Sequence, residues 1–466
     1  MPTKDRTEQE HPNRMTDTGI NEASRSDPDE RRDDGTHGGA QEQTMMERVL
    51  APANLHRAWR RVKANAGAPG IDGMTVDAFP AFGREHWSRI RSALMNGTYR
   101  PAAVRRVFIP KPDGSQRPLG VPTVLDRVIQ QALAQVLTPL FDSDFSDHSY
   151  GFREGRSAHQ AIRQLELGWQ AGCRHAVDCD LKSFFDTVNH DRLMSQLREK
   201  IKDRQVLGLI RQYLTASVKL PDGSRQETPE GVPQGGPLSP LLANIVLDPL
   251  DKELERRGHH FARYADDFIV MVRTAKAAQR VMRSLTAFIE DRLKLVVNRA
   301  KSHSAPLKQC AFLGFQIGSR GKVVWTVKAH ARFKQRVKQI TRRNRGHRVQ
   351  DVIDELHRYV TGWLNYYGIS NTYTGVLALD TWVRRRVRLY YWKQWKRPRT
   401  RRRHLLALGI PKDEVRMATR SRKGYWRMSH NSVVHRALTN QWLHEQGVPN
   451  MRALWITLRY GPDARI

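Results

Sequence analysis

An adjacent pair of aspartates within a strand-forming segment constrains the fold of this chain more than any other feature. The segment RYADDFIVMV runs from Arg263 to Val272, with apolar or aromatic residues on both sides of Asp266 and Asp267. Such a pattern predicts a β-hairpin that carries the two carboxylates at its turn. Because neighbouring carboxylates repel each other unless a cation lies between them, the turn is either a metal site or a solvated Asp-Asp turn.

A second acidic segment favours the metal site. The segment HAVDCDLKSFFDTVNH (175–190) begins as a strand, and we expect Asp180 at the end of that strand. Asp178 precedes it by two residues and should point to the same face of the sheet, so the pattern leaves Asp178 open as an alternative. Asp186 is expected to cap or pair locally. Two or three carboxylates on neighbouring strands suit the pair of magnesium ions that nucleotidyl transfer requires.

The charge of the chain predicts a polyanionic partner. The 466 residues carry a formal net charge of +32, and such a surface is best neutralised by RNA or DNA. The sequence has no apolar stretch of about 18 residues that could span a membrane and no signal peptide. Its three cysteines form no CxxC pair. These features argue against a membrane protein, a zinc ribbon and a disulfide framework, and they predict a cytoplasmic protein.

The composition changes twice along the chain. Residues 1–45 hold 6 basic and 11 acidic residues and almost no aromatics, which predicts a disordered tail. Strand-like and helix-like segments then alternate up to residue 320, which predicts a mixed α/β domain. Residues 320–466 hold 33 Lys or Arg against 8 Asp or Glu, and their basic runs include Arg384–Arg386 and Arg401–Arg403. This last part is predicted to be mainly helical.

Eight segments, in one order, resemble the bacterial group II intron-encoded reverse transcriptase/maturase proteins of the type that lacks an endonuclease. They are GAPGIDGMTVDAF (67–79), IPKPDGSQRPLGVPTVLDRVIQQAL (109–133), HSYGFREGRSAHQAI (148–162), the Asp180 segment, GVPQGGPLSPLLANIVLDPLDKEL (231–254), YADD (264–267), LKLVVNRAKSHSA (293–305) and FLGF (312–315). The resemblance implies a right-hand polymerase of α/β class. Fingers and palm would cover 46–320, a helical thumb or maturase domain 321–400, and a small basic DNA-binding module 401–466.

The resemblance assigns the chemistry to named residues. Asp180, Asp266 and Asp267 match the catalytic aspartates, which implies an RNA-directed DNA polymerase with two Mg²⁺ ions. Lys111 and Arg117 match residues that hold the triphosphate of the incoming dNTP; arginine offers a bidentate fork and lysine a point charge. Without the resemblance, Lys111 would be a surface lysine in a Pro-Asp-Gly turn.

Further residues match the nucleotide site. Phe185 corresponds to a steric gate against the 2′-hydroxyl, with Phe184 as the alternative; a core aromatic is the simpler interpretation of either. Gln234 corresponds to a residue near the nucleotide, and Lys301 to a lysine near the phosphates that could act as a general acid. Phe312, Leu313, Gly314 and Phe315 match the primer grip, which could otherwise be an ordinary apolar hairpin.

The chain after Gln234 also predicts local structure. Ser239 should be the N-cap of a helix with Pro240 at its first position, and Pro249 should kink that helix. In the thumb, the segment HRYVTGWLNYYGIS (357–370) matches the family best. Thumb helices would present Arg and Lys, including Arg384–Arg386, to a nucleic-acid backbone, whereas single tryptophans there are expected in the core.

The resemblance implies as partners the chain's own intron RNA, whose splicing it would assist, a primer–template, dNTPs and target DNA, with nucleoid association when mobile. No cysteine follows Cys310, and His430-Asn431 lacks metal-binding spacing. We therefore expect no target cutting, and retromobility would need another primer, such as a replication fork. Two alternatives are an RNA-binding splicing factor that has no need of catalysis and a retron or defence-type reverse transcriptase. The intact aspartates argue against the first, and the thumb match and the PKPDG-RPLG stretch argue against the second.

Overall fold

The computed structural model describes residues 43–110, 114 and 116–461, and from Thr44 on these form one compact unit. Residues 1–42 of the predicted tail lie outside the described residues. The first ordered helix begins at Met45, where Thr44 accepts a hydrogen bond from the backbone of Glu47 and Glu47 returns one to Thr44. This reciprocal capping box satisfies two of the free N–H groups at the start of the helix.

The fingers combine helices with a small sheet. Its strand order is β2-β1-β4-β5, with β1 and β4 parallel and the other neighbours antiparallel. The helix α4 is buried over most of its surface and forms the centre of the main core. The elements are α1 (Met45–Val49), α2 (Pro52–Ala64), α3 (Phe79–Met95), β1 (Val104–Pro110), β2 (Gln116–Val121), α4 (Val124–Asp142), α6 (His190–Lys200), α7 (Arg204–Leu214), β4 (Val218–Lys219) and β5 (Arg225–Gln226).

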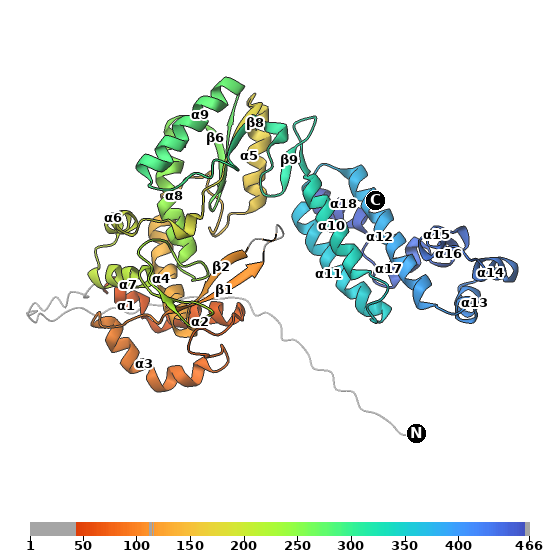
Figure 1. Cartoon of the computed structure of the whole chain (residues 1–466), viewed down its shortest axis with the longest axis horizontal. Helices are drawn as coiled ribbons and strands as arrows, with labels where there is room; N and C mark the ends of the chain where they lie inside the picture. Colours follow the sequence, from red (N-terminus) through yellow and green to blue (C-terminus); the bar gives the residue numbers. More distant parts are fainter. Residues whose placement is uncertain (1–42, 111–113, 115, 462–466) are drawn as a thin grey trace, which may run out of the picture. The chain divides into compact units, whose positions relative to one another are not determined.

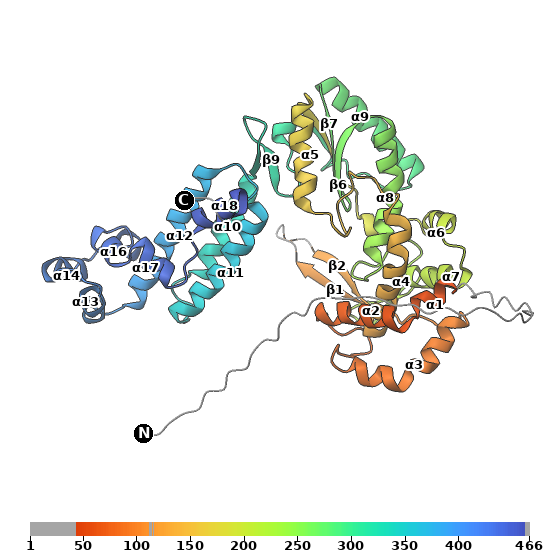
Figure 2. The same cartoon turned by 180° about the vertical axis from the view of Figure 1, so that it is seen from behind.

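The palm is an antiparallel sheet of order β6-β7-β3-β8. Alternate residues of β3 face opposite sides, as the period of a strand requires: Val177 and Cys179 pack in the core that includes α9, and Ala176 packs in the core that includes α5. Figures 1 and 2 show these two helices on either side of the strands. The elements are α5 (Ala158–Gln170), β3 (His175–Cys179), η1 (Phe184–Asp186), α8 (Ser239–Arg256), β6 (His260–Tyr264), β7 (Asp267–Val272), α9 (Ala275–Ala287), η2 (Phe288–Arg292), β8 (His303–Pro306) and η3 (Leu307–Gln309).

The helix α8 corrects one prediction about its sequence and contains the proline that was expected to kink it. Ser239 is the first residue of the helix instead of its N-cap, and its hydroxyl donates to the carbonyl of Pro233 at 2.6 Å. Pro249 lies inside the helix, which continues past it to Arg256. Proline has no N–H for the carbonyl four residues earlier, and here the side chain of Gln196 donates to that carbonyl, Ile245 O, at 3.0 Å. The lost helical hydrogen bond is thus replaced from a neighbouring helix.

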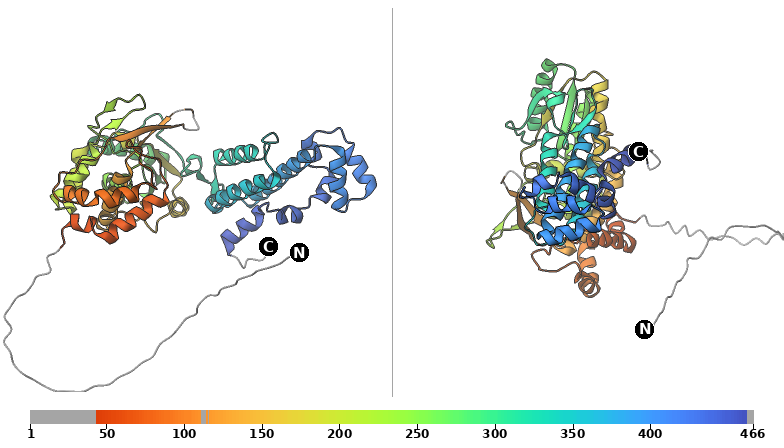
Figure 3. Two further views of the ribbon diagram at one scale, coloured as in Figure 1. Left: turned by 90° about the horizontal axis from the view of Figure 1, so that it is seen from below. Right: turned by 90° about the vertical axis from the view of Figure 1, so that its right-hand side faces the viewer.

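After the palm, a short hairpin leads into a helical region. The hairpin strands are antiparallel, and the predicted border at 320/321 falls between them; the predicted border at 400/401 falls inside α13. From α10 on, the described residues are helices and loops, coloured cyan to blue in Figure 3. The elements are β9 (Phe315–Ile317), β10 (Val323–Trp325), α10 (Val327–Ile340), α11 (Val349–Tyr367), α12 (Tyr373–Gln394), α13 (Pro398–Ala407), α14 (Lys412–Thr419), α15 (Tyr425–Met428), α16 (Ser432–Ala437), α17 (Asn440–Glu445) and α18 (Met451–Tyr460).

The thumb and the C-terminal helices share one core. A continuous set of buried residues runs from Trp325 to Trp455. The indole of Trp455 donates to Ser370 O at 3.2 Å, and Arg388 donates to Leu438 O at 2.8 Å. The predicted C-terminal module is therefore packed on the thumb. Among the described residues, none of the helices is both long and apolar enough to cross a bilayer.

Candidate active site

The predicted hairpin with two carboxylates is present in the palm. Tyr264 on β6 pairs with Asp267 on β7, and only Ala265 and Asp266 lie between them. Ala265 has a φ of 59°, a left-handed conformation that costs an L-residue roughly 1–2 kcal/mol. The tight turn places Asp266 at its tip and Asp267 at the start of the next strand.

The neighbouring strand brings Asp180 to the same edge. Cys179 pairs with Phe268, so the residue after β3 lies beside the turn. By strand alternation Asp178 and Asp267 face the same side of the sheet. The pKa of Asp267 rises to about 7 because protein atoms partly desolvate its carboxyl and the negative charges of Asp178, Asp266 and Asp180 surround it. Asp267 is an exposed residue, and a cation bound beside it would offset the negative charges of its neighbours.

A loop after α9 holds Asp180 in place. The Nδ2 of Asn298 donates to Asp180 Oδ2 at 2.8 Å, and the backbone N–H of Asp180 donates to Ser302 Oγ at 3.0 Å. Lys301 Nζ lies 4.0 Å from Asp180 Oδ2, although two thirds of its side chain is exposed. Lys301 was predicted from the sequence, whereas Asn298 and Ser302, three residues before it and one after it, were not; their contacts with Asp180 depend on how the loop folds.

The acidic set fits a divalent cation that brings further ligands with it. In residues 43–110, 114 and 116–461, no three His, Cys, Asp or Glu side chains are close enough to hold an ion by themselves. Magnesium is typically bound by one or two carboxylates and completed by water and substrate phosphates. The hard oxygens of Asp180 and Asp266, and the repulsion that raises the pKa of Asp267, suit this kind of binding.

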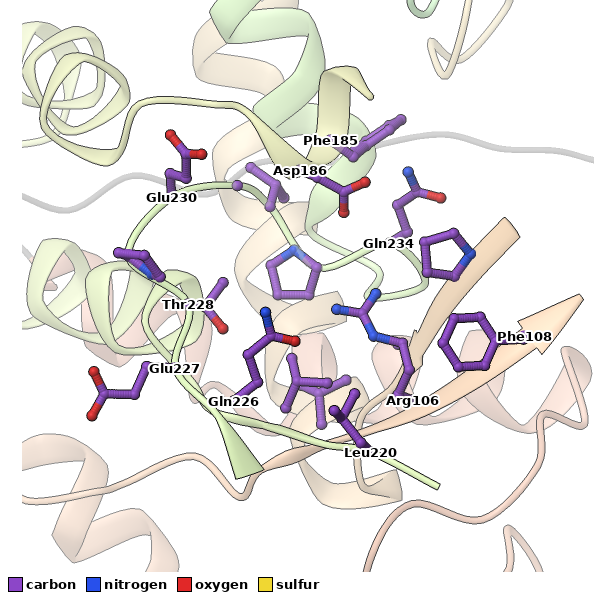
Figure 4. A pocket seen from close by; sticks show the side chains of 18 residues that line it. Arg106, Phe108, Phe185, Asp186, Leu220, Gln226, Glu227, Thr228, Glu230 and Gln234 are labelled. Atoms are coloured by element: carbon purple, nitrogen blue, oxygen red, sulfur yellow. The ribbon is translucent and has the colours of Figure 1, made fainter. Parts of the chain in front are cut away.

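Two predicted nucleotide-site residues line one cavity of about 400 Å³. Phe185 and Gln234 lie on its wall, as Figure 4 shows. Both phenylalanines belong to the main core, Phe184 at 2% and Phe185 at 8% exposure, and of the two only Phe185 lines the cavity. Asp186 also lines the cavity. In the described part of the chain its carboxylate has no hydrogen-bond or ion-pair partner, so the expected local cap is wrong; Asn189 caps the next helix instead.

The predicted phosphate-binding arginine contacts this wall. The Nε of Arg117 donates to Gln234 Oε1 at 3.0 Å, and the backbone of Gly120 donates to Gln234 O at 2.7 Å. A Cβ on Gly235 would lie 2.3 Å from Gly120 O, so only glycine allows this approach of the loop to β2. Lys111 lies outside the described residues.

The predicted primer grip is a tight turn. Phe312 and Phe315 exchange backbone hydrogen bonds of 2.9 Å, and Leu313 and Gly314 between them both have positive φ. Both phenylalanine rings are buried, at 1% and 0% exposure, so a primer could meet only the turn itself. The hydroxyl of Tyr366 on α11 donates to Leu313 O at 2.9 Å, which fixes the turn to the thumb.

The arginine run on α12 does not form the predicted nucleic-acid surface. Arg384 is 7% exposed, and its Nε lies 2.8 Å from Asp380 Oδ2, although without the direction of a hydrogen bond. Arg385 donates to Trp426 O and stacks at 3.8 Å over the Trp426 ring. Arg386 donates to the hydroxyl and carbonyl of Thr341. These arginines tie protein elements together.

The tryptophans of this region largely follow the core prediction. The exposed fractions of Trp363, Trp392 and Trp395 are 8%, 1% and 7%, and Trp382 packs partly buried against the same core. Trp426 is 40% exposed. The guanidinium of Arg385 stacks on this ring, and its exposure makes Trp426 the tryptophan of this set that is best placed for contact with another molecule.

Comparisons with known proteins agree with this architecture. Residues 109–317 match the reverse transcriptase (RNA-dependent DNA polymerase) family, and residues 330–409 match the maturase-specific domain of group II introns. The first match contains the three aspartates, and a reverse transcriptase domain implies a divalent-metal-dependent polymerase. The second covers most of α10 and all of α11, α12 and α13.

Curated relatives match somewhat more than half of the chain. The chain is 34% identical over 301 residues to protein YkfC of Escherichia coli K12, covering 56% of this chain and 78% of that protein. It is 30% identical over 354 residues to the group II intron-encoded protein LtrA of Lactococcus lactis, covering 62% of this chain and 58% of LtrA. A Cas6-RT-Cas1–Cas2 complex aligns over 53% of this chain and 43% of its own, with 26% identity and a TM-score of 0.35, which is too low to carry an argument. From the two family matches and these relatives, the chain belongs to the group II intron-encoded reverse transcriptase/maturase family, and its palm is that of an RNA-directed DNA polymerase.

Proposed function

We propose that this chain copies RNA into DNA by adding deoxynucleotides to a primer 3′-hydroxyl, and that it also binds its own group II intron RNA. The polymerase activity is supported mainly by one observation: Asp180 lies beside the Asp266-Asp267 turn at one edge of the palm sheet. Two carboxylate-bearing strands and a nucleotide-sized cavity on the adjoining loop supply what nucleotidyl transfer needs.

The proposed metal site takes two magnesium ions. Asp180, Asp266 and Asp267 would hold them, and the ions would supply the charge that lowers the pKa of the primer hydroxyl and stabilises the leaving pyrophosphate. In the protein without a bound cation, the repulsion among these carboxylates, which contributes with desolvation to the raised pKa of Asp267, is destabilising. A splicing factor without catalysis would have no reason to keep that repulsion, which supports the polymerase over this alternative.

The remaining site residues would handle the nucleotide. Arg117, with Lys111, would bind the triphosphate oxygens, and Gln234 would orient Arg117 through their hydrogen bond. The ring of Phe185 on the cavity wall would exclude a 2′-hydroxyl. Lys301, beside Asp180, would donate a proton to the pyrophosphate as it leaves.

The basic helical region would bind the intron RNA. Maturation requires a broad positive surface that binds one RNA conformation better than others, and exposed Lys and Arg side chains on α10 offer such a surface. Residues 401–466 would bind target DNA during retromobility, in a bacterial cytoplasm where the protein associates with the nucleoid. Because Phe312 and Phe315 are 1% and 0% exposed, the turn at Leu313 would be the part that supports the primer end.

Primer extension tests the proposal. Purified chain should extend a DNA primer on an RNA template with dNTPs and magnesium, and chelation of the metal should stop it. Asp266→Asn should abolish extension without changing RNA affinity in filter binding, because this carboxylate would hold metal and not RNA. Asp291→Asn, which changes an exposed aspartate on η2, is the matched control and should extend normally. Normal extension by Asp266→Asn would overturn the metal-ligand assignment.

A further inference from the structure

The catalytic turn depends on a residue in an unfavourable conformation. Ala265 has a φ of 59° and is 5% exposed. Two-residue hairpin loops usually place glycine, asparagine or aspartate at such positions. The methyl group of alanine forms no hydrogen bond that could hold the turn, so the surrounding structure must do so. The conformation matters because the next residue is Asp266.

A wholly buried arginine contacts this turn. The side chain of Arg263 is 0% exposed. Its Nε donates to both oxygens of Asp251, at 2.8 and 2.9 Å. Its Nη1 donates to Ala265 O at 3.0 Å and to Asn244 Oδ1 at 2.9 Å. A planar guanidinium held at one end by a carboxylate delivers its other N–H groups in fixed directions, and here one of them reaches the strained residue.

The asparagine forms a second arm of the same network. The Nδ2 of Asn244 donates to Gly151 O at 2.9 Å. The backbone of Gly151 lies directly against the turn, because a Cβ there would stand 2.3 Å from Ala265 N. One neighbour thus binds the carbonyl of Ala265 while another presses on its amide side. Asn244 links the two, since it accepts from Arg263 and donates to Gly151.

A single helix supplies both partners of the arginine. Asn244 and Asp251 lie seven residues apart on α8, which is about two helical turns, so they share one face. They are 1% and 0% exposed in an otherwise apolar interior. The desolvation penalty of a buried aspartate–arginine pair can exceed the free energy gained from their attraction, so the pair by itself contributes little to stability. Its contact with the turn gives it another role.

We propose that Arg263 is a positioning residue, which holds Ala265 in the left-handed conformation and thereby sets Asp266 for the divalent cation. Asn244 and Asp251 fix the guanidinium that does this. The inference rests on the proposed polymerase function, and it assigns no contact between Arg263 and substrate or metal.

The test removes the branched guanidinium of Arg263 but keeps its positive charge. Arg263→Lys can still pair with Asp251 but cannot also reach Ala265 O and Asn244. We expect kcat for primer extension to fall about 10–100-fold, the effect of a displacement on the order of 1 Å in an active site. The magnesium concentration for half-maximal rate should rise, and KM for primer–template should stay unchanged. Binding of Mn²⁺ alone, measured by electron paramagnetic resonance, should weaken in parallel without any need for catalysis.

Rescue separates positioning from a merely structural role. Glycine adopts positive φ without strain, so Ala265→Gly in the Arg263→Lys protein should restore much of the rate and the Mn²⁺ affinity. Arg153→Lys is the matched control: Arg153 is also buried, pairs with Asp142 and binds carbonyls, but it does not contact the turn. Arg153→Lys should keep its Mn²⁺ affinity, and Ala265→Gly should not improve it.

Each result decides between the inference and its alternatives. Unchanged Mn²⁺ affinity in a folded Arg263→Lys protein would overturn the inference, and so would a loss that Ala265→Gly fails to repair. If Arg263→Lys does not fold, Asn244→Ala removes one arm, leaves the ion pair intact, and should show a smaller loss with the same rescue. A wild-type chain that binds Mn²⁺ but extends no primer would refute the proposed function alone.

Discussion

The acidic palm and the basic thumb use charged side chains in opposite ways. In the palm, the Asp180 side chain remains 44% exposed. Asp267 is an exposed residue, and partial desolvation of its carboxyl together with the neighbouring carboxylates raises its pKa to about 7. In the thumb, Arg384 and Arg388 are 7% and 4% exposed and bind groups of the protein itself. Charges that must meet a ligand stay accessible at an electrostatic cost. A large number of basic residues, by contrast, does not by itself make a binding surface.

Helix geometry explains why the run of arginines on α12 predicted the wrong surface. Successive residues of an α-helix are about 100° apart, so Arg384–Arg386 spread over about 200° and reach three different elements. Two residues four apart share a face, as Lys328 and Arg332 do on α10, where both are exposed. Spacing along the helix is therefore a better guide to a basic surface than the number of basic residues.

The largest expected effect comes from the palm. Asp180→Ala should lower primer extension about 10³-fold or more, because metal-based stabilisation of the transition state contributes several kcal/mol. Intron RNA affinity and assisted splicing should remain, since those depend on the basic half of the chain. Primer extension, filter binding and a splicing assay on one preparation measure all three.

Asp178→Ala is the companion variant, because Asp178 also contributes to the acidic cluster. Extension that survives Asp180→Ala but not Asp178→Ala would move the metal ligand to Asp178. Loss of splicing together with extension in Asp180→Ala would end the separation of the two regions.

The next effect concerns the stability of the thumb. Arg384→Ala should lower the free energy of unfolding by about 3 kcal/mol, because it leaves Asp380 buried without its cation. Asp380 also accepts from the backbone of Met451 at 3.1 Å, so the C-terminal helix should loosen as well. Urea denaturation measures the change, and Arg399→Ala, at an exposed position of α13, is the control. If Arg384→Ala lost RNA affinity while its stability stayed unchanged, Arg384 would contribute to RNA binding and not to the stability of the thumb.

Much of the palm could be predicted because its signals are local. The apolar and aromatic residues that flank Asp266 and the end of a short strand at Asp180 require no knowledge of distant contacts. Phe185 and Gln234 were named by the family resemblance, and the structure brings the two to one cavity; the role of Phe185 as a steric gate stays a prediction. The start of α8 was misplaced by one residue because the hydroxyl of Ser239 bonds to a preceding loop carbonyl instead of capping the helix.

The rest could not be predicted because it depends on tertiary packing. Asn298 holds Asp180 only because its loop folds back over the strand, 118 residues away in sequence. Arg263 looked like one more basic residue in a basic chain, and its burial follows from the partners that α8 brings to it. The same holds for Arg386, whose half-burial lowers the pKa of its guanidinium through desolvation. Charge counts carry no information about such pairings.

Sugar selection should show an intermediate effect. Phe185→Val should open the cavity wall and reduce discrimination between dGTP and GTP about tenfold or more, which is within the range that a change in pocket size produces. Phe184→Val is the matched control: both rings belong to the core, so either change should lower the melting temperature, but Phe184 does not line the cavity and its loss should leave discrimination intact. Competition between the two nucleotides in single-nucleotide extension measures the ratio. If only Phe184→Val changes it, the gate is the neighbouring ring.

The smallest effect would locate the RNA surface. Lys328 and Arg332 are exposed and share a face of α10, so changing both to Ala should remove up to two phosphate contacts without disturbing the core. Each contact contributes a slope of roughly −0.7 to −0.9 in log affinity against log salt. The double variant should therefore bind intron RNA more weakly at low salt and show a slope flatter by about 1.4–1.8.

A matched pair in the palm makes this small effect interpretable. Lys276 and Arg280 have the same residue types, spacing and exposure on α9, so Lys276→Ala with Arg280→Ala removes equal charge from the other region. General repulsion and attraction over the whole molecule would change both variants alike, whereas a defined surface on α10 would change only the thumb variant. Equal salt slopes in the two double variants would show that RNA senses net charge and not this face. A flatter slope in the thumb variant alone, with primer extension on a saturating primer–template unchanged, would place RNA binding on α10 and complete the contrast with the acidic palm.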